Sequence, residues 1–155
     1  MKIYKYNIIN KIELNGRRHI YFLGVKIFSY KKKRPKSLIS CEIPNYQALI
    51  NEGTKFPHPV GIVISRAATI GKNCVIFQNV TIGAKFAPTL DKKYYPTIGD
   101  NCRICAGAVI IGPVKIGNNA VIGANSVVVK DVAENAIVAG VPAKFIRYRK
   151  ENEYV

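Results

Sequence analysis

The sequence of 155 residues is poor in several residue types on which common protein functions depend. It has nine Asp and Glu against 24 Lys and Arg, and only two histidines, His19 and His58. A structural zinc site needs four ligands at suitable spacing, and the C-x-x-C pair of Cys102 and Cys105 has no such set of partners in the sequence. No metal is therefore expected, and the four cysteines are interpreted as reduced thiols of a cytoplasmic protein.

Long apolar runs are also absent, because Gly, Asn or Lys interrupts every apolar stretch within a few residues. Neither a signal peptide nor a membrane span is expected. A Gly-rich loop of the P-loop or Rossmann kind is missing too, which argues against nucleotide binding of those types. The length fits one compact domain with an appendage.

What the sequence does contain is isoleucine at every sixth position of its second half. The series comprises Ile64, Ile70, Ile76 and Ile82, then Ile98, Ile104, Ile110, Ile116 and Ile122, with Val128 in step. Four positions after each of these except Ile82 comes a small or slim residue, namely Ala68, Cys74, Val80, Cys102, Ala108, Val114, Ala120, Ser126 and Val132. A short fixed period predicts a solenoid whose units bury apolar faces by stacking, so both series should point inward. Three hexads make one triangular coil of a parallel β-helix, whereas an antiparallel sandwich needs alternation with period two.

The corners and one interruption of this solenoid can also be predicted. Glycine often follows the isoleucine, as at Gly71, and asparagine often stands third after it, as at Asn73. Both residue types tolerate left-handed or tightly turned backbone, which suits corners. The spacing of sixteen residues between Ile82 and Ile98 breaks the period. Residues 84–96 should therefore leave the coil as a protruding loop.

Residues 1–40 stand outside the repeat and hold eleven Lys and Arg but one acidic residue, Glu13. Apolar stretches on either side of Asn15-Gly16 predict a β-hairpin. The basic run from Lys31 to Lys36 that follows is either a solvated linker or a peripheral contact with an anionic surface, such as the lipid headgroups of the inner membrane face. Nucleic acid is not expected, because no nucleic-acid-binding fold accompanies the charge. The expected organisation is a basic segment at 1–40, a β-helix at 41–147 and a tail at 148–155.

The hexad pattern resembles that of the hexapeptide-repeat acyltransferases, and the resemblance implies a left-handed all-β solenoid. The stretch His58-Pro-Val-Gly61-Ile-Val-Ile64 resembles the H-x-x-G-I-V-I motif of serine acetyltransferases and their polysaccharide-modifying relatives. The match runs on through Gln78-Asn79-Val-Thr81-Ile-Gly83, and Ala139-Gly-Val-Pro142-Ala-Lys144 is a marker of the same family. The family implies an O-acetyltransferase that uses acetyl-coenzyme A and forms a homotrimer with sites between subunits.

The resemblance assigns a catalytic pair. In this family a histidine takes the proton of the acceptor hydroxyl, a task that suits imidazole near neutral pH, and His58 matches that histidine. A carboxylate one coil earlier, at the start of a D-I-x-P stretch, holds the histidine. The corresponding stretch here is Glu42-Ile43-Pro44, so Glu42 is the candidate, with Glu52 as the alternative. His19 lacks such a context.

The resemblance also implies contacts to both substrates. Those to the coenzyme carry over to Gly83, Ala84, Ala106, Ala124, Val129, Lys130, Lys144 and Arg147. Small residues there let pantetheine approach the backbone, and the cations can meet phosphates. Ala106 and Ala124 should stack one coil above the other, and Gly83 or Ala84 should offer a backbone N–H to the oxyanion. Contacts to the acceptor are expected from Gln78, Asn79, Tyr94 and Tyr95.

The acceptor itself is predicted from what the motifs lack. Pro57, Tyr94 and Tyr95 stand where serine acetyltransferases carry charged residues that hold or assist serine. Two tyrosines suit a sugar ring, unless they only pack the loop. The stretch from Arg18 to Lys31 also resembles leader segments of bacterial surface-polysaccharide enzymes. A sugar of a surface polysaccharide or its precursor is therefore expected, with serine as the first alternative and a non-catalytic β-helix that binds anionic surfaces as the second.

Overall fold

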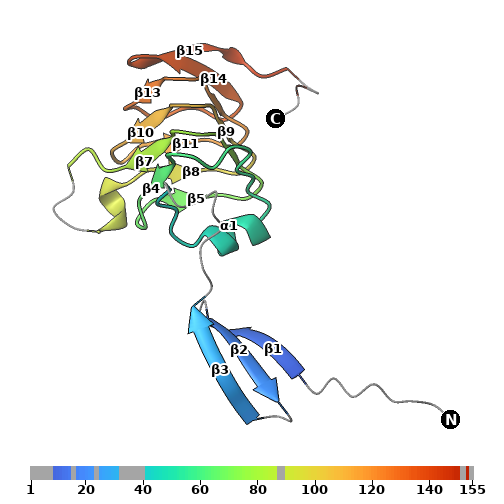
Figure 1. Cartoon of the computed structure of the whole chain (residues 1–155). Helices are drawn as coiled ribbons and strands as arrows, with labels where there is room; N and C mark the ends of the chain where they lie inside the picture. Colours follow the sequence, from blue (N-terminus) through green and yellow to red (C-terminus); the bar gives the residue numbers. More distant parts are fainter. Residues whose placement is uncertain are drawn as a thin grey trace. The chain divides into compact units, whose positions relative to one another are not determined.

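The computed structural model describes residues 9–14, 17–22, 25–31, 41–86, 90–150 and 153, and in the first three ranges it describes the backbone. The chain divides into two compact units, Met1–Lys36 and Ser37–Val155. In the first unit, β1 (Ile9–Leu14), β2 (Arg17–Phe22) and β3 (Val25–Lys31) form an antiparallel sheet in that order (Figure 1). Leu14 pairs with Arg17 across the predicted Asn-Gly position, so the hairpin is confirmed, while the turn itself and the expected boundary at residue 40 lie outside the described residues.

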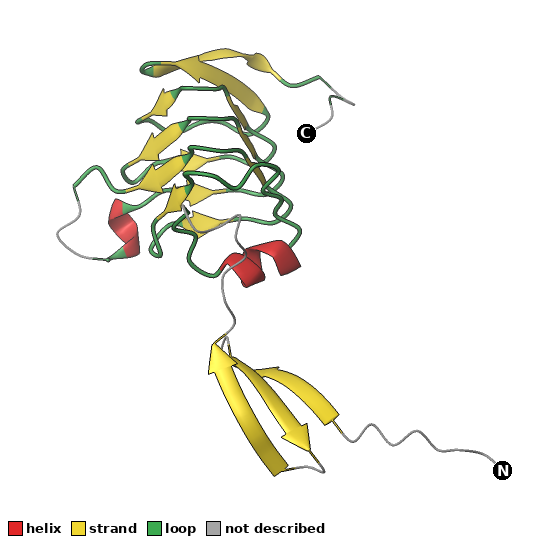
Figure 2. Cartoon of the chain, viewed as in Figure 1, coloured by secondary structure: helices red, strands yellow, loops and turns green. Residues whose placement is uncertain are grey.

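The second unit is a parallel β-helix with three flat faces, which Figure 2 shows as stacked yellow arrows joined by green corners. Face 1 consists of β4 (Val63–Ile64), β7 (Thr81–Gly83), β10 (Val109–Ile111) and β13 (Val127–Val128). Face 2 consists of β5 (Thr69–Ile70), β8 (Thr97–Ile98) and β11 (Lys115–Ile116). Face 3 consists of β6 (Val75–Ile76), β9 (Arg103–Ile104), β12 (Val121–Ile122), β14 (Ala136–Gly140) and β15 (Ala143–Tyr148).

The register between coils follows the hexads. Ile64 pairs with Ile82 and Ile110 pairs with Val128, which is eighteen residues in both cases. Between these coils Ile82 pairs with Ile110, twenty-eight residues on. The ten additional residues belong to the predicted loop, within which Lys92–Tyr94 form a 3-10 helix, η2.

The core of the β-helix is the stacked isoleucine and small-residue series. Apart from Ile70 and Ala68, every member of both predicted series is buried, and Ser126 is fully buried as well. Ile70 and Ala68 lie near the N-terminal end of the solenoid, where no complete coil covers them. Each buried isoleucine contributes about 1.5 to 3 kcal/mol relative to an exposed one, so stacking is the main source of stability.

Asparagine and glycine act differently at the corners. All five predicted asparagines have positive φ, namely Asn73, Asn79, Asn101, Asn119 and Asn125. The glycines that follow the isoleucines do not, so their predicted left-handed role is wrong. A Cβ at Gly71 would instead lie 2.5 Å from the carbonyl carbon of Gly99 in the next coil. The absence of a side chain therefore permits close stacking of the coils at this position.

Both ends of the solenoid are covered by the chain itself. At the N-terminal end, Tyr46 and Leu49 of helix α1 (Tyr46–Asn51) pack against the core. At the other end, β14 turns back into β15, which pairs with it antiparallel. Over the ranges that the structure describes, no helix is long and apolar enough to cross a membrane.

Candidate active site

The corner before face 1 is longer in the first coil than in the coils above, and His58 lies in the additional stretch. Lys55 bridges to Val75, twenty residues on, whereas Val63 pairs with Thr81, eighteen residues on. The first coil therefore has two more residues between faces 3 and 1. These residues cannot join either sheet, and the exposed His58 projects from the corner.

The backbone around His58 is held on both sides. Pro57 and Pro59 fix their own φ angles and restrict the residue between them. The His58 carbonyl accepts a hydrogen bond from the Val60 N–H at 2.8 Å, and the Pro59 carbonyl accepts one from the Cys41 thiol at 2.8 Å. The histidine thus stands on a stiff, clamped turn.

The His58 imidazole faces an aromatic ring of the next coil. Its centroid lies 6.4 Å from that of Phe77, with an angle of 42° between the two rings. The guanidinium carbon of Arg103, one coil higher, lies 4.9 Å from the same Phe77 centroid. Neither Phe77 nor Arg103 was predicted from the sequence. The contacts of Phe77 with His58 and with Arg103 depend on the offset between coils, which no local motif encodes.

The two candidate carboxylates lie at different places on the first coil. Glu42 forms a bridge with Val63 at the edge of face 1, where its N–H donates to the Ile62 carbonyl at 2.8 Å. Its exposed side chain makes no hydrogen bond or ion pair with His58 in the part of the chain that the structure describes. Glu52 follows α1, and its carbonyl accepts the Asn73 N–H at 3.0 Å, at the corner between faces 2 and 3. Glu42 therefore borders the same face as His58, and Glu52 does not.

Three predicted contact residues form a column of stacked corners above Val60, two residues after His58, and a fourth lies at the top; the four are here called the corner ridge. It consists of Gln78, Ala106, Ala124 and, at the top, Lys144. The Gly107 N–H donates to the Gln78 carbonyl at 2.9 Å, and the Asn125 N–H donates to the Ala106 carbonyl at 2.9 Å. The predicted stacking of Ala106 and Ala124 is therefore confirmed. Lys144 of β15 is placed at this end by its pairing with Ala139 of β14.

The corner ridge and the adjacent Asn79 have local features that bear on ligand binding. Asn79, directly after Gln78, has a φ of 58° and shapes the turn. The side-chain oxygen of Gln78 is buried without a hydrogen-bond partner. Ala106 is half-buried and Ala124 is exposed, and neither has a side chain beyond Cβ. The corner ridge thus offers a path on which a long ligand can approach the backbone.

The other predicted coenzyme residues lie on the opposite edge of face 1. Gly83 ends β7, Ala84 follows it, and Val129 and Lys130 follow β13 of the same face. The Gly83 carbonyl accepts the Gly112 N–H at 3.0 Å, while the Ala84 N–H donates no hydrogen bond within the described ranges. The candidate coenzyme contacts of one chain therefore fall into two groups, separated by the width of face 1.

Arg147 is engaged by an acidic neighbour. Its guanidinium donates to both carboxylate oxygens of Glu153, at 2.8 Å and 2.6 Å. This pairing lowers the pKa of Glu153 to about 2 and raises the pKa of Arg147. A phosphate at Arg147 would have to displace a carboxylate, in contrast to Lys130 and Lys144, which have no ion pair in the described part of the chain.

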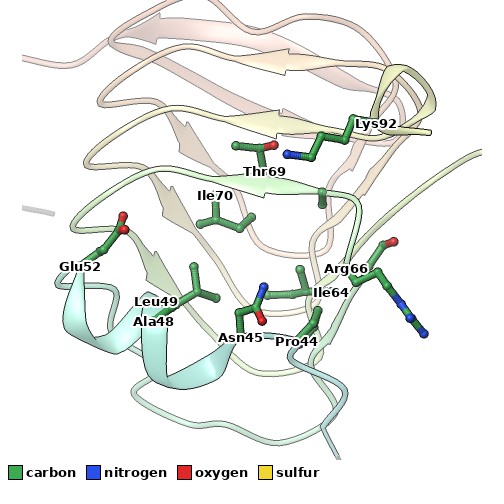
Figure 3. A pocket seen from close by; sticks show the side chains of 12 residues that line it. Pro44, Asn45, Ala48, Leu49, Glu52, Ile64, Arg66, Thr69, Ile70 and Lys92 are labelled. Carbon is green, nitrogen blue, oxygen red and sulfur yellow. The ribbon is translucent and has the colours of Figure 1, made fainter. Parts of the chain in front are cut away.

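The two loop tyrosines pack rather than form an open platform. Tyr95 is buried at 6% exposure, and the half-buried Tyr94 lies under the Lys93 ammonium, 5.1 Å from its ring centroid. The loop also reaches the N-terminal end of the solenoid, where Lys92 borders a pocket of about 230 Å³. Figure 3 shows Lys92 near Thr69 on one side of this pocket and Glu52 on the other.

The four cysteines form no metal site in this structure. No disulfide joins any of them, and the described ranges contain no cluster of three His, Cys, Asp or Glu side chains. Cys74 and Cys102 stack in the core, where a thiol hydrogen bond between them lowers the pKa of Cys74 and, together with burial, raises that of Cys102. Cys105 lies apart on the corner ahead of Ala106.

Comparison with known proteins agrees with this architecture. A family model described as bacterial transferase hexapeptide (six repeats) matches residues 95–130. Residues 95–130 therefore carry the hexapeptide repeat that this family model describes. The serine acetyltransferase of Mycobacterium tuberculosis is 41% identical to it over 99 residues, which are 64% of this chain and 42% of that protein. The chain thus spans about two fifths of the length of the curated relatives it matches.

Two solved structures extend the comparison. The Neisseria gonorrhoeae serine acetyltransferase in complex with serine is 42% identical, with a TM-score of 0.55 over 59% of this chain and 36% of that one. A serine acetyltransferase in complex with CoA is 38% identical, with a TM-score of 0.54 over 60% of this chain and 37% of that one. The resemblance to serine acetyltransferases and the left-handed parallel β-helix are confirmed.

The prediction of a sugar acceptor, and with it a part in polysaccharide biosynthesis, is wrong. The similar proteins are serine acetyltransferases at 37% to 42% identity, which favours the serine alternative. The physical premise also fails, because Tyr95 is buried in the loop and cannot present its ring to a sugar. The uncharged residues Pro57, Tyr94 and Tyr95 differ from the charged residues expected in serine acetyltransferases, but this difference does not show that the acceptor is another molecule.

Proposed function

We propose that the protein is a serine O-acetyltransferase that uses acetyl-coenzyme A as donor. The observation that carries the proposal is the position of His58. It stands exposed on a clamped turn at the foot of the corner ridge, within a stretch that resembles the H-x-x-G-I-V-I motif of serine acetyltransferases. A base at this place can meet a thioester whose pantetheine arm follows Ala106 and Ala124.

The proposed reaction is a direct transfer. The His58 imidazole takes the proton of the serine hydroxyl while that oxygen attacks the thioester carbonyl carbon. The bond to sulfur then breaks, coenzyme A leaves as a thiolate that receives the proton from the imidazolium, and O-acetylserine remains. Glu42 would accept a hydrogen bond from the other imidazole nitrogen and stabilise the imidazolium.

The negative charge on the carbonyl oxygen needs a donor in the transition state. A backbone N–H fixed by a sheet can supply one, and such a donor contributes about 3 kcal/mol to transition-state stabilisation. Ala84 is the best candidate, because its N–H donates no hydrogen bond within the described ranges. Gly83, which ends β7, holds the Ala84 N–H in place.

The coenzyme is proposed to bind between two chains of a homotrimer. The corner ridge of one chain and the Ala84 and Lys130 edge of the next would form the two walls of its groove. This arrangement explains why the candidate contacts of a single chain lie on two separate edges of face 1. Lys144 and Lys130 would meet the phosphates by charge-assisted hydrogen bonds, while Gln78 and Asn79 would line the acceptor side.

The basic segment at residues 1–40 is proposed to make a peripheral contact with an anionic surface. Its support is the excess of eleven basic residues over one acidic residue. Such contacts weaken as salt shortens the Debye length, so binding to anionic vesicles should be salt-sensitive. If the protein does not bind anionic vesicles at low salt, the basic run from Lys31 to Lys36 is a solvated linker.

Thiol release from acetyl-coenzyme A tests the central proposal. We expect release that depends on serine, with kcat/KM in the usual enzyme range of about 10⁴ M⁻¹s⁻¹ or more. Glycine, which lacks the hydroxyl, is the matched control and should give no release. Coenzyme binding without serine-dependent release would refute the proposal and favour the non-catalytic β-helix instead.

A further inference from the structure

Arg103 is a cation close to the candidate base that the proposed reaction does not yet use. It lies in β9 on face 3 and is half-buried. Its guanidinium carbon is 4.9 Å from the Phe77 centroid, and the same ring is 6.4 Å from the His58 imidazole. A single aromatic side chain therefore joins the cation to the base.

The charge of Arg103 is not balanced by any neighbour that the structure describes. Its side chain makes no ion pair or hydrogen bond in the described ranges. Its partners on the adjacent strands are Val75 below and Val121 above, so neither can provide a carboxylate. The contact with the Phe77 ring steadies the guanidinium group, whose N–H groups remain available to an anion.

The proposed substrate carries the anion that this arrangement lacks. The carboxylate and the hydroxyl of serine are separated by only two carbon atoms. Imidazole would reach the hydroxyl at a heavy-atom distance of about 2.6 to 3.2 Å, and a guanidinium binds a carboxylate through two parallel N–H groups at about 2.8 Å. The two distances to the Phe77 centroid place the imidazole centroid and the guanidinium carbon within about 11 Å of each other, a gap that one serine molecule hydrogen-bonded at both ends can span.

We infer that Arg103 binds the carboxylate of serine and thereby determines the acceptor specificity of the site. This inference rests on the proposed function. It explains how an acceptor with a carboxylate can be held although Pro57, Tyr94 and Tyr95 carry no charge. Phe77 sets the spacing between base and cation, so that the hydroxyl is presented to His58 when the carboxylate is bound.

The test compares serine with serinamide, in which a neutral amide replaces the carboxylate. In Arg103→Gln, the KM for serine should rise about 10- to 100-fold, the cost of losing hydrogen bonds to a charged group. The KM for acetyl-coenzyme A and the rates with serinamide should stay as in the wild type, so the preference for serine over serinamide disappears. Arg103→Lys keeps the charge and should recover part of that preference.

A matched control removes a cation elsewhere. Lys115→Gln makes the same charge change at an exposed position of β11 on face 2 and should leave the preference for serine unchanged.

A raised KM for acetyl-coenzyme A in Arg103→Gln would overturn the inference and make Arg103 a coenzyme contact. An equal loss with serine and serinamide would also overturn it, since that result indicates a structural role. A wild-type protein without serine-dependent release would refute the proposed function and the inference with it, whereas an unchanged preference in Arg103→Gln would refute the inference alone.

Discussion

His58 shows how neighbouring residues can make one side chain suitable for catalysis. Two prolines flank it, two backbone carbonyls of its turn accept hydrogen bonds, and the Phe77 ring lies on one side of the imidazole. Each restraint reduces the number of conformations that the His58 side chain and its turn can adopt before the imidazole meets the acceptor hydroxyl. A base that is already oriented loses less freedom in the transition state.

Replacing His58 by alanine should separate chemistry from binding. The variant loses the base but keeps the corner ridge, so turnover should fall about 100-fold or more while coenzyme affinity stays near that of the wild type. Steady-state kinetics and calorimetric titration with coenzyme A measure the two effects independently. Turnover at the wild-type level would rule out His58 as the base.

Coil stacking at the element scale can be tested with a pair of glycines. A Cβ at Gly71 would lie 2.5 Å from the carbonyl carbon and 2.6 Å from the carbonyl oxygen of Gly99, and this backbone cannot move without separating two coils. Gly71→Ala should therefore destabilise the protein by about 1 to 3 kcal/mol. Gly83→Ala is the matched control, because nothing lies within 4 Å of the added Cβ, and its stability should change by about 0.5 kcal/mol or less.

Urea unfolding at one fixed protein concentration measures this difference, since the apparent stability of an oligomer depends on concentration. Equal midpoints for Gly71→Ala and the wild type would show that the coils can separate without cost at this position. If Gly83→Ala lost as much stability as Gly71→Ala, a clash between stacked coils would not be the cause of the destabilisation in Gly71→Ala.

The elements differ in how far their sequence alone could predict them. The faces were predictable because burial repeats every six residues, and the loop was predictable because Ile82 and Ile98 break that period. The long corner at His58 was not, because its two additional residues are recognised only by comparing the offsets of Lys55 and Val63 with the coil above. The same holds for Phe77, which meets His58 across coils, and for Arg103, which meets Phe77 one coil higher, because neither shares a motif with His58.

Tyr95 illustrates a second limit of sequence reasoning. Its aromatic ring was interpreted as a sugar platform because the sequence shows which side chain is present but not which face is covered. In the structure it is buried beside Pro96, where the loop returns to face 2. The exposure of a side chain depends on which other segments of the chain cover it, so it could be determined only from the folded structure.

The whole molecule is expected to function as an assembly rather than as a single solenoid. Within one chain, the corner ridge and the edge with Ala84 and Lys130 border face 1 from opposite sides. A cyclic trimer brings one edge of each chain against the other edge of its neighbour, and three identical grooves result. Each groove then depends on residues from two chains.

Mixed trimers test this arrangement. His58→Ala disables the corner ridge side of a groove and Lys130→Glu disables the opposite side, so each variant alone should have little activity. When the two are unfolded, mixed in equal amounts and refolded together, about a quarter of the grooves in a trimer should pair an intact His58 with an intact Lys130. Serine-dependent thiol release should recover to about that fraction of the wild-type rate. Each variant refolded alone is the control. Sedimentation of an active monomer, or a refolded trimeric mixture without recovery, would show that every site is built within one chain and that the groove is not shared.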